Sequence, residues 1–173
     1  MRPFPSALPF AALLLSALVP TAPANARDSL GIYEGWGAFR DPAAGGAGPR
    51  CYAIAKAEPS RLQRDYEPFA AIGTWPRAGL RNQVHFRLSR RLAPGSPIVL
   101  NIAGQRFTLT GGGGDAWAAD RRMDAAVVAA MRSATSMTVS ARGASGGGFS
   151  NTWALAGAAT AMDAAAIGCA QLR

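Results

Sequence analysis

The chain has 173 residues, of which 49% are hydrophobic and 16% are charged, which excludes a disordered protein and favours a single domain. Its formal net charge is +8, and it contains one histidine and two cysteines. So small a set of candidate ligands excludes a zinc finger, an iron–sulfur cluster or a histidine-rich metal site on this chain alone. We therefore expect no metal ion and no cofactor.

Residues 1–26 predict a secretory signal peptide. Arg2 supplies the positive charge before an apolar run at residues 4–19, and residues 24–26 (Ala-Asn-Ala) form a cleavage site. The run is short for a membrane-spanning helix, and a short uncleaved anchor is the alternative. We expect the mature protein to be a single domain over residues 27–173, with no transmembrane segment. Because Arg2 is the only charged residue removed, the net charge falls to +7.

Export places the mature chain in the periplasm or outside the cell, where conditions are oxidising. An even number of cysteines in such a compartment predicts a disulfide bond between Cys51 and Cys169. The chain-entropy model assigns a loop of this length about 4–5 kcal/mol of stabilisation. Two buried free thiols are the alternative.

The first half of the mature chain predicts strands and no helix. Strands are expected at residues 35–39, 51–55, 69–75 and 83–89, with a Gly-, Pro- and Ala-rich loop at 41–50. The fourth strand alternates strictly, so Val84, Phe86 and Leu88 are expected to face inward. The same alternation places His85 and Arg87 on the outer face.

The second half predicts further strands and two helices. In chain order we expect a hairpin of strands 98–102 and 105–110, a flexible link at 111–114, a helix capped by Asp120 that runs to about 134, strands at 136–141 and 149–155, and an alanine-rich helix at 158–170. The fold class is mainly β with two helices (α+β). It is an antiparallel sheet or sandwich with one helix before the last two strands and an Ala-rich C-terminal helix.

The order of motifs resembles the invasion-associated locus B family of small secreted bacterial proteins. The resemblance rests on Trp36 in an N-terminal strand, the stretch Cys51-Tyr52-Ala53, an Arg-rich strand, the apolar hairpin at 98–109, Trp117 before a helix that ends Ala130-Met131-Arg132, and a last strand that runs from Trp153 to Ala158. It implies a secreted β-rich domain, linked in some bacteria to host-cell invasion, without an established enzymatic activity or ligand. Family members often carry another cysteine pair just before the helix, where this chain has residues 115–119 (Asp-Ala-Trp-Ala-Ala).

His85 is the one candidate general base with an ordinary pKa near neutrality. A catalytic triad could combine it with Ser89, Ser136 or Ser140 and with Asp115 or Asp120, and this is the basis of a hydrolase hypothesis. The chain lacks a Gly-x-Ser-x-Gly nucleophile motif, so a surface histidine is the favoured interpretation.

Asp120 and Asp124 stand four residues apart at a helix start. A pair of helical carboxylates can bind a metal ion, but no third ligand lies near them in the sequence. Their favourable interaction with the positive end of the helix dipole is the simpler explanation.

Arginines are the strongest surface signal. We expect Arg81, Arg87 and Arg106 to form one continuous outer surface, because alternation along a strand points Arg81 and Arg87 the same way and points Arg106 away from the inward residues of its own strand. Guanidinium groups bind carboxylates and phosphates in two-pronged fashion. The expected partner is an anionic envelope component or an acidic protein surface, while the compartment argues against nucleic acid. A solvated basic face without a ligand is the alternative.

These observations predict a non-enzymatic secreted or periplasmic protein that binds an envelope component or another protein. A periplasmic hydrolase that uses His85 and a structural envelope-stress protein are the alternatives.

Overall fold

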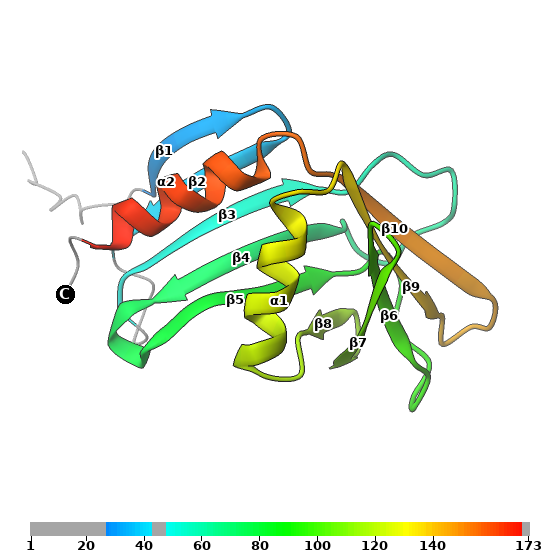
Figure 1. Cartoon of the computed structure of the whole chain (residues 1–173). Coiled ribbons are helices and arrows are strands. Elements are labelled where there is room, and N and C mark those ends of the chain that lie inside the picture. Colours follow the sequence, from blue (N-terminus) through cyan, green and yellow to red (C-terminus); the bar gives the residue numbers. More distant parts are fainter. Residues whose placement is uncertain (1–26, 43–47, 171–173) are drawn as a thin grey trace, which may run out of the picture.

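A computed structural model describes residues 27–42 and 48–170, and over these ranges it shows a ten-stranded antiparallel sheet with two α-helices (Figure 1). This confirms the predicted α+β class, with the second helix at the C-terminal end. The predicted signal peptide at 1–26 and residues 43–47 of the predicted loop lie outside the described residues.

The strands are β1 (Asp28–Tyr33), β2 (Trp36–Asp41), β3 (Arg50–Lys56), β4 (Phe69–Trp75), β5 (Leu80–Arg87), β6 (Ile98–Ile102), β7 (Gln105–Gly112), β8 (Asp115–Trp117), β9 (Ser136–Arg142) and β10 (Gly148–Ala154). The helices are α1 (Arg121–Met131), α2 (Ala158–Ala170) and the short 3-10 turn η2 (Pro76–Ala78). The spatial order of the strands is β1-β2-β3-β4-β5-β8-β7-β6-β9-β10.

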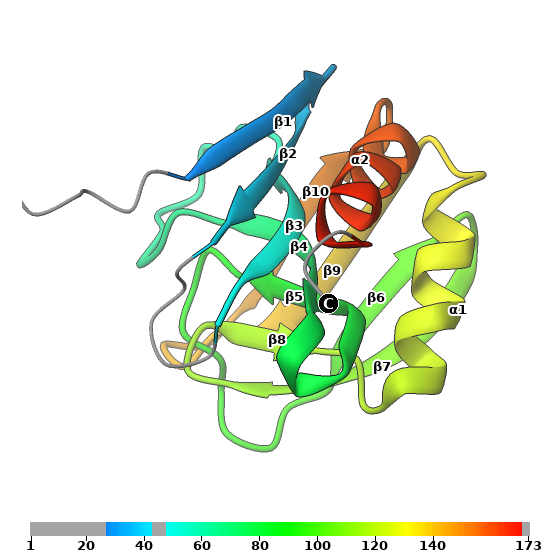
Figure 2. The ribbon, with the colours of Figure 1, turned by 90° about the vertical axis from the view of Figure 1, so that its left-hand side faces the viewer.

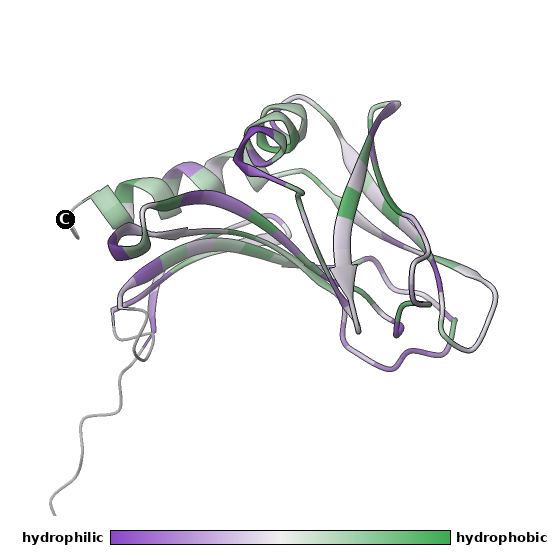
Figure 3. Ribbon diagram, turned by 90° about the horizontal axis from the view of Figure 1, so that it is seen from below, coloured by the Kyte–Doolittle hydropathy of each residue, from purple (hydrophilic) through white to green (hydrophobic). Residues whose placement is uncertain are grey.

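The sheet has two parts, which we call the first part (β1–β5 and β8) and the second part (β6, β7, β9 and β10). Strand β7 joins them, because it pairs with β8 on one side and with β6 on the other. Helix α2 packs on β1–β4, whereas α1 contacts β5 and β6 (Figure 2). Seen from below, the first part curves along α2, and the second part stands apart from that helix (Figure 3).

Alanines allow α2 to lie close to the first part. The helix buries Ala158, Ala161 and Ala165, and the strands beneath it bury Ala38 and Ala53. Small side chains on both surfaces bring the two backbones near each other, and close packing replaces bulk in this half of the core. Larger side chains, such as Trp36, Phe86 and Trp153, fill the rest of the core.

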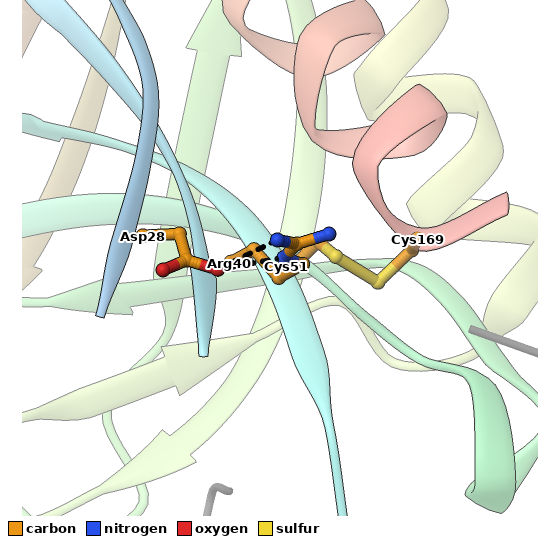
Figure 4. A network of polar contacts seen from close by, with 4 residues as sticks. All are labelled: Asp28, Arg40, Cys51 and Cys169. Carbon is orange, nitrogen blue, oxygen red and sulfur yellow. Dashed lines mark hydrogen bonds and ion pairs between the residues drawn. A yellow bond between two sulfur atoms is a disulfide. The ribbon is translucent and has the colours of Figure 1, made fainter. Parts of the chain in front are cut away.

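A disulfide bond fastens the end of α2 to β3. Cys51 and Cys169 have Cα atoms 5.7 Å apart and are the pair that the sequence predicts (Figure 4). Arg40, directly opposite Cys51 on β2, donates from Nε and Nη2 to the Asp28 carboxylate at 2.9 and 2.7 Å. The disulfide and this ion pair therefore lie side by side on neighbouring strands.

Strands β1 and β8 were not predicted. Strand β1 breaks the apolar alternation at Gly31, which has a φ of 137° and lies at a register shift. Strand β8 has three residues, too few to show an alternation of apolar and polar side chains in the sequence. Its pairing with β5 and β7 is decided by tertiary contacts.

The predicted flexible link at residues 111–114 is wrong for its first two residues. Gly111 and Gly112 belong to β7 and pair with β8. A Cβ atom at Gly111 would lie 2.2 Å from the Asp115 carbonyl oxygen. This glycine therefore serves the close approach of two backbones rather than flexibility.

Helix α1 begins where the sequence predicts and ends earlier. The Asp120 side chain accepts a hydrogen bond from the Met123 N–H at 2.8 Å, which confirms the cap. The helix ends at Met131 instead of about residue 134. Its buried face includes Val127, Val128 and Met131, as the period predicts.

Candidate functional site

The outer face of the first part, which points away from α2, is unusually apolar. One row runs directly across the strands through Ile32, Gly37, Ile54, Ala71, His85 and Trp117. With the neighbouring outward residues, the larger side chains of this surface are Ile32, Phe39, Tyr52, Ile54, Phe69 and Trp117, and we call them the apolar face. Ile32 is 66% exposed and Trp117 is 36% exposed. An antiparallel sheet that meets water on one side ordinarily carries polar residues there.

The apolar face contains a hollow of about 340 Å³. Ile32, Phe39, Ile54 and Phe69 line it, with Gly37 at its floor. A Cβ atom at Gly37 would lie 2.6 Å from the Phe39 ring, so the ring covers the glycine and forms a wall of the hollow. The glycine in the middle of this strand thus makes room for the Phe39 ring, which lies over it and shapes the hollow.

Charged side chains border this hollow. Lys56, Glu34 and Glu67 line its edge, and Glu67 accepts an ion pair from Arg64 at 3.2 Å. Lys56 is the only lysine of the chain and is exposed. The border of the hollow is therefore mixed in charge, and the hollow itself can hold an apolar group.

His85 lies at the other end of the apolar face and points outward, as its alternation predicts. Its Nε2 atom lies 2.9 Å from Asp115 Oδ1, and its ring stacks on Trp117 at 5.1 Å between centroids. Phe69 meets the same ring edge-on at 5.4 Å. Asp115 also binds the Arg87 guanidinium through its other oxygen. The structure thus brings His85 to Asp115, one of the two acidic partners that the sequence offered, and not to Asp120. Sequence reasoning without strand β8 missed the stacking of His85 on Trp117.

The structure does not join His85 to a serine. In the described part of the chain its hydrogen bond goes to Asp115, and no serine hydroxyl is bonded to it. Ser89 is buried, and its N–H donates to the Asn151 side chain at 2.9 Å. Ser136 and Ser140 belong to β9, in the second part of the sheet. The cluster therefore holds the imidazole between aromatic rings, and no nucleophile is positioned beside it.

Tyr52 occupies the far corner of the apolar face. The Arg27 and Arg50 guanidinium groups lie 5.5 and 5.4 Å from its ring centre. Burial raises the pKa of the Tyr52 hydroxyl, and the two arginines partly offset this effect. Tyr52 is therefore neutral at physiological pH and supplies an apolar ring framed by positive charge.

Asp124 does more than interact with the helix dipole. It is buried, and its Oδ1 atom accepts a hydrogen bond from the Val84 N–H at 2.8 Å, which links α1 to β5. Burial raises the pKa of the Asp124 carboxyl. Within residues 27–42 and 48–170, no three His, Cys, Asp or Glu side chains gather as a metal site would require.

The three arginines of the predicted basic surface lie in three different surroundings. Arg87 belongs to the outer face of the first part, where it pairs with Asp115. Arg106 lies beside Asn101 on the second part. Arg81 lines a hollow next to Cys169, on the helix side of the sheet.

Arg81 departs from the predicted alternation because β5 is irregular near its start. The pairing between β4 and β5 shifts register between Gly73 and Trp75, and Asn82 has a φ of 54°. An extra residue at such a bulge reverses the faces of the residues that precede it. The assumption that Arg81 and Arg87 point the same way therefore fails.

Among the described helices, neither α1 nor α2 combines the length and the apolar character needed to cross a membrane. No protein-family model, no curated protein and no solved structure matches this chain. The resemblance to the invasion-associated locus B family thus stays a prediction from the sequence, and functional inference rests on the geometry of the described residues.

Proposed function

We propose that this protein is an exported, non-enzymatic binding protein of the cell envelope whose apolar face docks on an anionic phospholipid surface. The observation that carries the proposal is the apolar face itself, with exposed Ile32 and Trp117 at opposite ends of one row across the sheet. Contiguous exposed apolar surface of this kind marks interaction sites in soluble proteins.

The net charge of the chain, rather than the mixed border of the hollow, favours an anionic lipid surface over a neutral partner. The net charge expected for the mature chain is +7, and Lys56 and Arg27 border the apolar face. A surface that combines aromatic and aliphatic residues with basic ones matches the boundary between acyl chains and anionic headgroups. The predicted signal peptide and the Cys51–Cys169 pair both support an envelope location.

For the hydrolase alternative the geometry supplies the His85–Asp115 pair, but among the described residues no serine hydroxyl is bonded to His85. Asp115 binds both the imidazole and Arg87, an arrangement that fixes the ring within the apolar face. We assign His85 and Asp115 the role of holding Trp117 in place at the end of the docking surface.

The test is co-sedimentation of the exported protein with vesicles of phosphatidylglycerol, compared with vesicles of phosphatidylcholine. Ile32→Glu should weaken binding to phosphatidylglycerol about ten- to a hundredfold, because burial of such a side chain contributes about 1.5–3 kcal/mol. Ile167→Glu is the matched control, because Ile167 is 67% exposed and lies on α2, away from the apolar face. Binding should also weaken as salt rises from 0.1 M to 1 M.

Three outcomes count against the proposal. Equal binding by the two glutamate variants would remove the apolar face from the interaction. Absence of binding to phosphatidylglycerol at low salt would favour a structural envelope protein. Capture of an acidic protein by the parent, lost in Ile32→Glu and without vesicle binding, would assign the same face to a protein partner.

A further inference from the structure

We infer that a second site, on the helix side of the sheet, binds the phosphate group of a small organic ligand. The site is a hollow of about 570 Å³ between the β4–β5 connection and the end of α2. The residues that carry the argument are Thr74, Arg77, Arg81, Asn82, Ala166 and Cys169, all of which line the hollow.

Two arginines give the hollow its charge. Arg77 and Arg81 both line it, and neither forms an ion pair with another residue of the described ranges. The described lining includes no Asp or Glu. A phosphate monoester carries a charge of about −1.5 to −2 at neutral pH, which two guanidinium groups match. Guanidinium forks also fit the oxygens of a phosphate geometrically.

Local backbone conformation brings both arginine side chains to the hollow. Arg77 belongs to η2, and Gly48 passes so close to it that a Cβ atom there would lie 2.6 Å from Arg77 Cδ. Arg81 reaches the helix side because of the irregularity at Asn82, a non-glycine residue with a φ of 54°. The Asn82 N–H donates to Thr74 Oγ1 at 3.2 Å and stabilises this turn. Unusual backbone of this kind is often retained where it positions a functional group.

Besides the polar Thr74 and Asn82, the hollow has an apolar wall that a disulfide bond fixes in place. Ala166 and Pro76 face it, and Cys169 closes it through the disulfide bond to Cys51. The hollow is larger than a bare phosphate ion, so it has room for an organic portion beside these side chains. The disulfide holds the wall that α2 contributes in position relative to the arginines on the sheet.

This inference is independent of the proposed lipid docking. The apolar face lies on the outer side of the sheet, whereas Thr74 and Arg81 lie on the side of α2. Loss of either activity therefore need not affect the other.

Titration calorimetry of the exported protein with glycerol 3-phosphate, inorganic phosphate and acetate tests the site. We expect saturable binding of glycerol 3-phosphate, weaker binding of inorganic phosphate and the weakest response to acetate. The double variant Arg77→Ala/Arg81→Ala should lose binding, with each arginine contributing about tenfold. Arg81→Lys should bind more weakly than the parent, because an ammonium group cannot form the two-pronged contact.

Arg121→Ala/Arg122→Ala is the matched control, because it removes two exposed arginines from α1 and leaves the hollow intact. Equal binding by the two double variants would overturn the inference, as would absence of saturable binding in the parent at low salt. If the arginines only offset the carbonyl groups at the end of α2, the Arg77/Arg81 variant would be less stable and the parent would not bind phosphate. Retained vesicle binding by that variant would separate this site from the lipid surface.

Discussion

The two parts of the sheet have similar inward faces, but their outward faces differ in chemical character. Inward residues are apolar in both parts, such as Val84 and Phe86 in the first and Leu100 and Val139 in the second. The outward residues of the second part are mainly hydroxyl, amide and guanidinium side chains, at Asn101, Arg106, Thr108, Thr138, Ser140, Ser150 and Thr152. Those of the first part include the apolar face, with the polar cluster of His85, Arg87 and Asp115 at one end. The inner alternation therefore builds the fold, and the outer residues decide which part can recognise a partner.

The two parts of the sheet also differ in the interactions that stabilise them. The first part is covered by α2, which packs through alanines and is tied to β3 by the disulfide bond. The second part is stabilised by large core residues, including Trp153, and by cross-strand pairs such as Thr138 with Thr152, whose hydroxyl oxygens lie 2.9 Å apart. Both parts bury large side chains, such as Trp36 and Phe86 in the first, but among the described residues only the first part adds a covalent link where α2 packs through alanines.

Removal of the disulfide bond should produce the largest loss of stability and the clearest difference between the two parts of the sheet. Cys51→Ser/Cys169→Ser is expected to lower the free energy of unfolding by about 2–5 kcal/mol. Urea denaturation measures this loss, and hydrogen exchange should show faster opening of α2 and β1–β3 than of β9 and β10. Equal loss of protection in both parts would show that they do not depend differently on the covalent link.

Changes at Asp124 should have the next largest effect, because this residue ties α1 to β5 between the two parts. Asp124→Ala leaves the Val84 N–H without its acceptor and should cost about 1–3 kcal/mol of stability. Asp124→Asn keeps an acceptor oxygen and removes the charge, so it should be at least as stable as the parent at neutral pH. Thermal unfolding of the two variants side by side tests this difference.

The contribution of Asp124 to the free energy of unfolding should change with pH in a definite direction. Burial raises its pKa in the folded state, so its neutral form is the one that folding favours. The stability associated with that form is complete below the ordinary carboxyl pKa of about 4 and is lost as pH rises through the raised value. Unfolding curves of Asp124→Asn should lack this decline, and a parallel decline in parent and variant would contradict the assignment.

The smallest effect is expected at the ion pair between the helices. Arg132 Nη2 lies 2.6 Å from Asp163 Oδ1, and the two residues connect the end of α1 to α2. Both side chains are about half exposed, so Arg132→Ala should cost less than about 1 kcal/mol. Arg132 lowers the pKa of Asp163, so this contribution exists above the ordinary carboxyl pKa and is lost as pH falls through the lowered value. Denaturation should show a smaller difference between parent and variant at pH 3 than at pH 7.

Local pattern predicts most of the elements correctly. The strands at 69–75 and 98–102 and the helix at 158–170 have the predicted bounds, because turn residues or changes of period delimit them in the sequence. The Asp120 cap and the inward positions of Val84 and Phe86 also follow from short-range rules. The cysteine pair follows from compartment chemistry, which acts on any two thiols that the fold brings together.

Only the tertiary structure decided which functional side chains lie close together. Strand β8 brings Asp115 and Trp117 to His85 across 30 or more residues of sequence, and three residues carry no period that could announce such a strand. The bulge at Asn82 sends Arg81 to the opposite side of the sheet from Arg87, because one extra residue reverses the faces of a strand. The sequence by itself determined which residues of the regular strands face inward, such as Val84 and Phe86, since these follow from local alternation, but it did not predict the burial of Asp124. Which exposed residues meet one another depends on register and on strand order, and these are set by contacts between segments far apart in the chain.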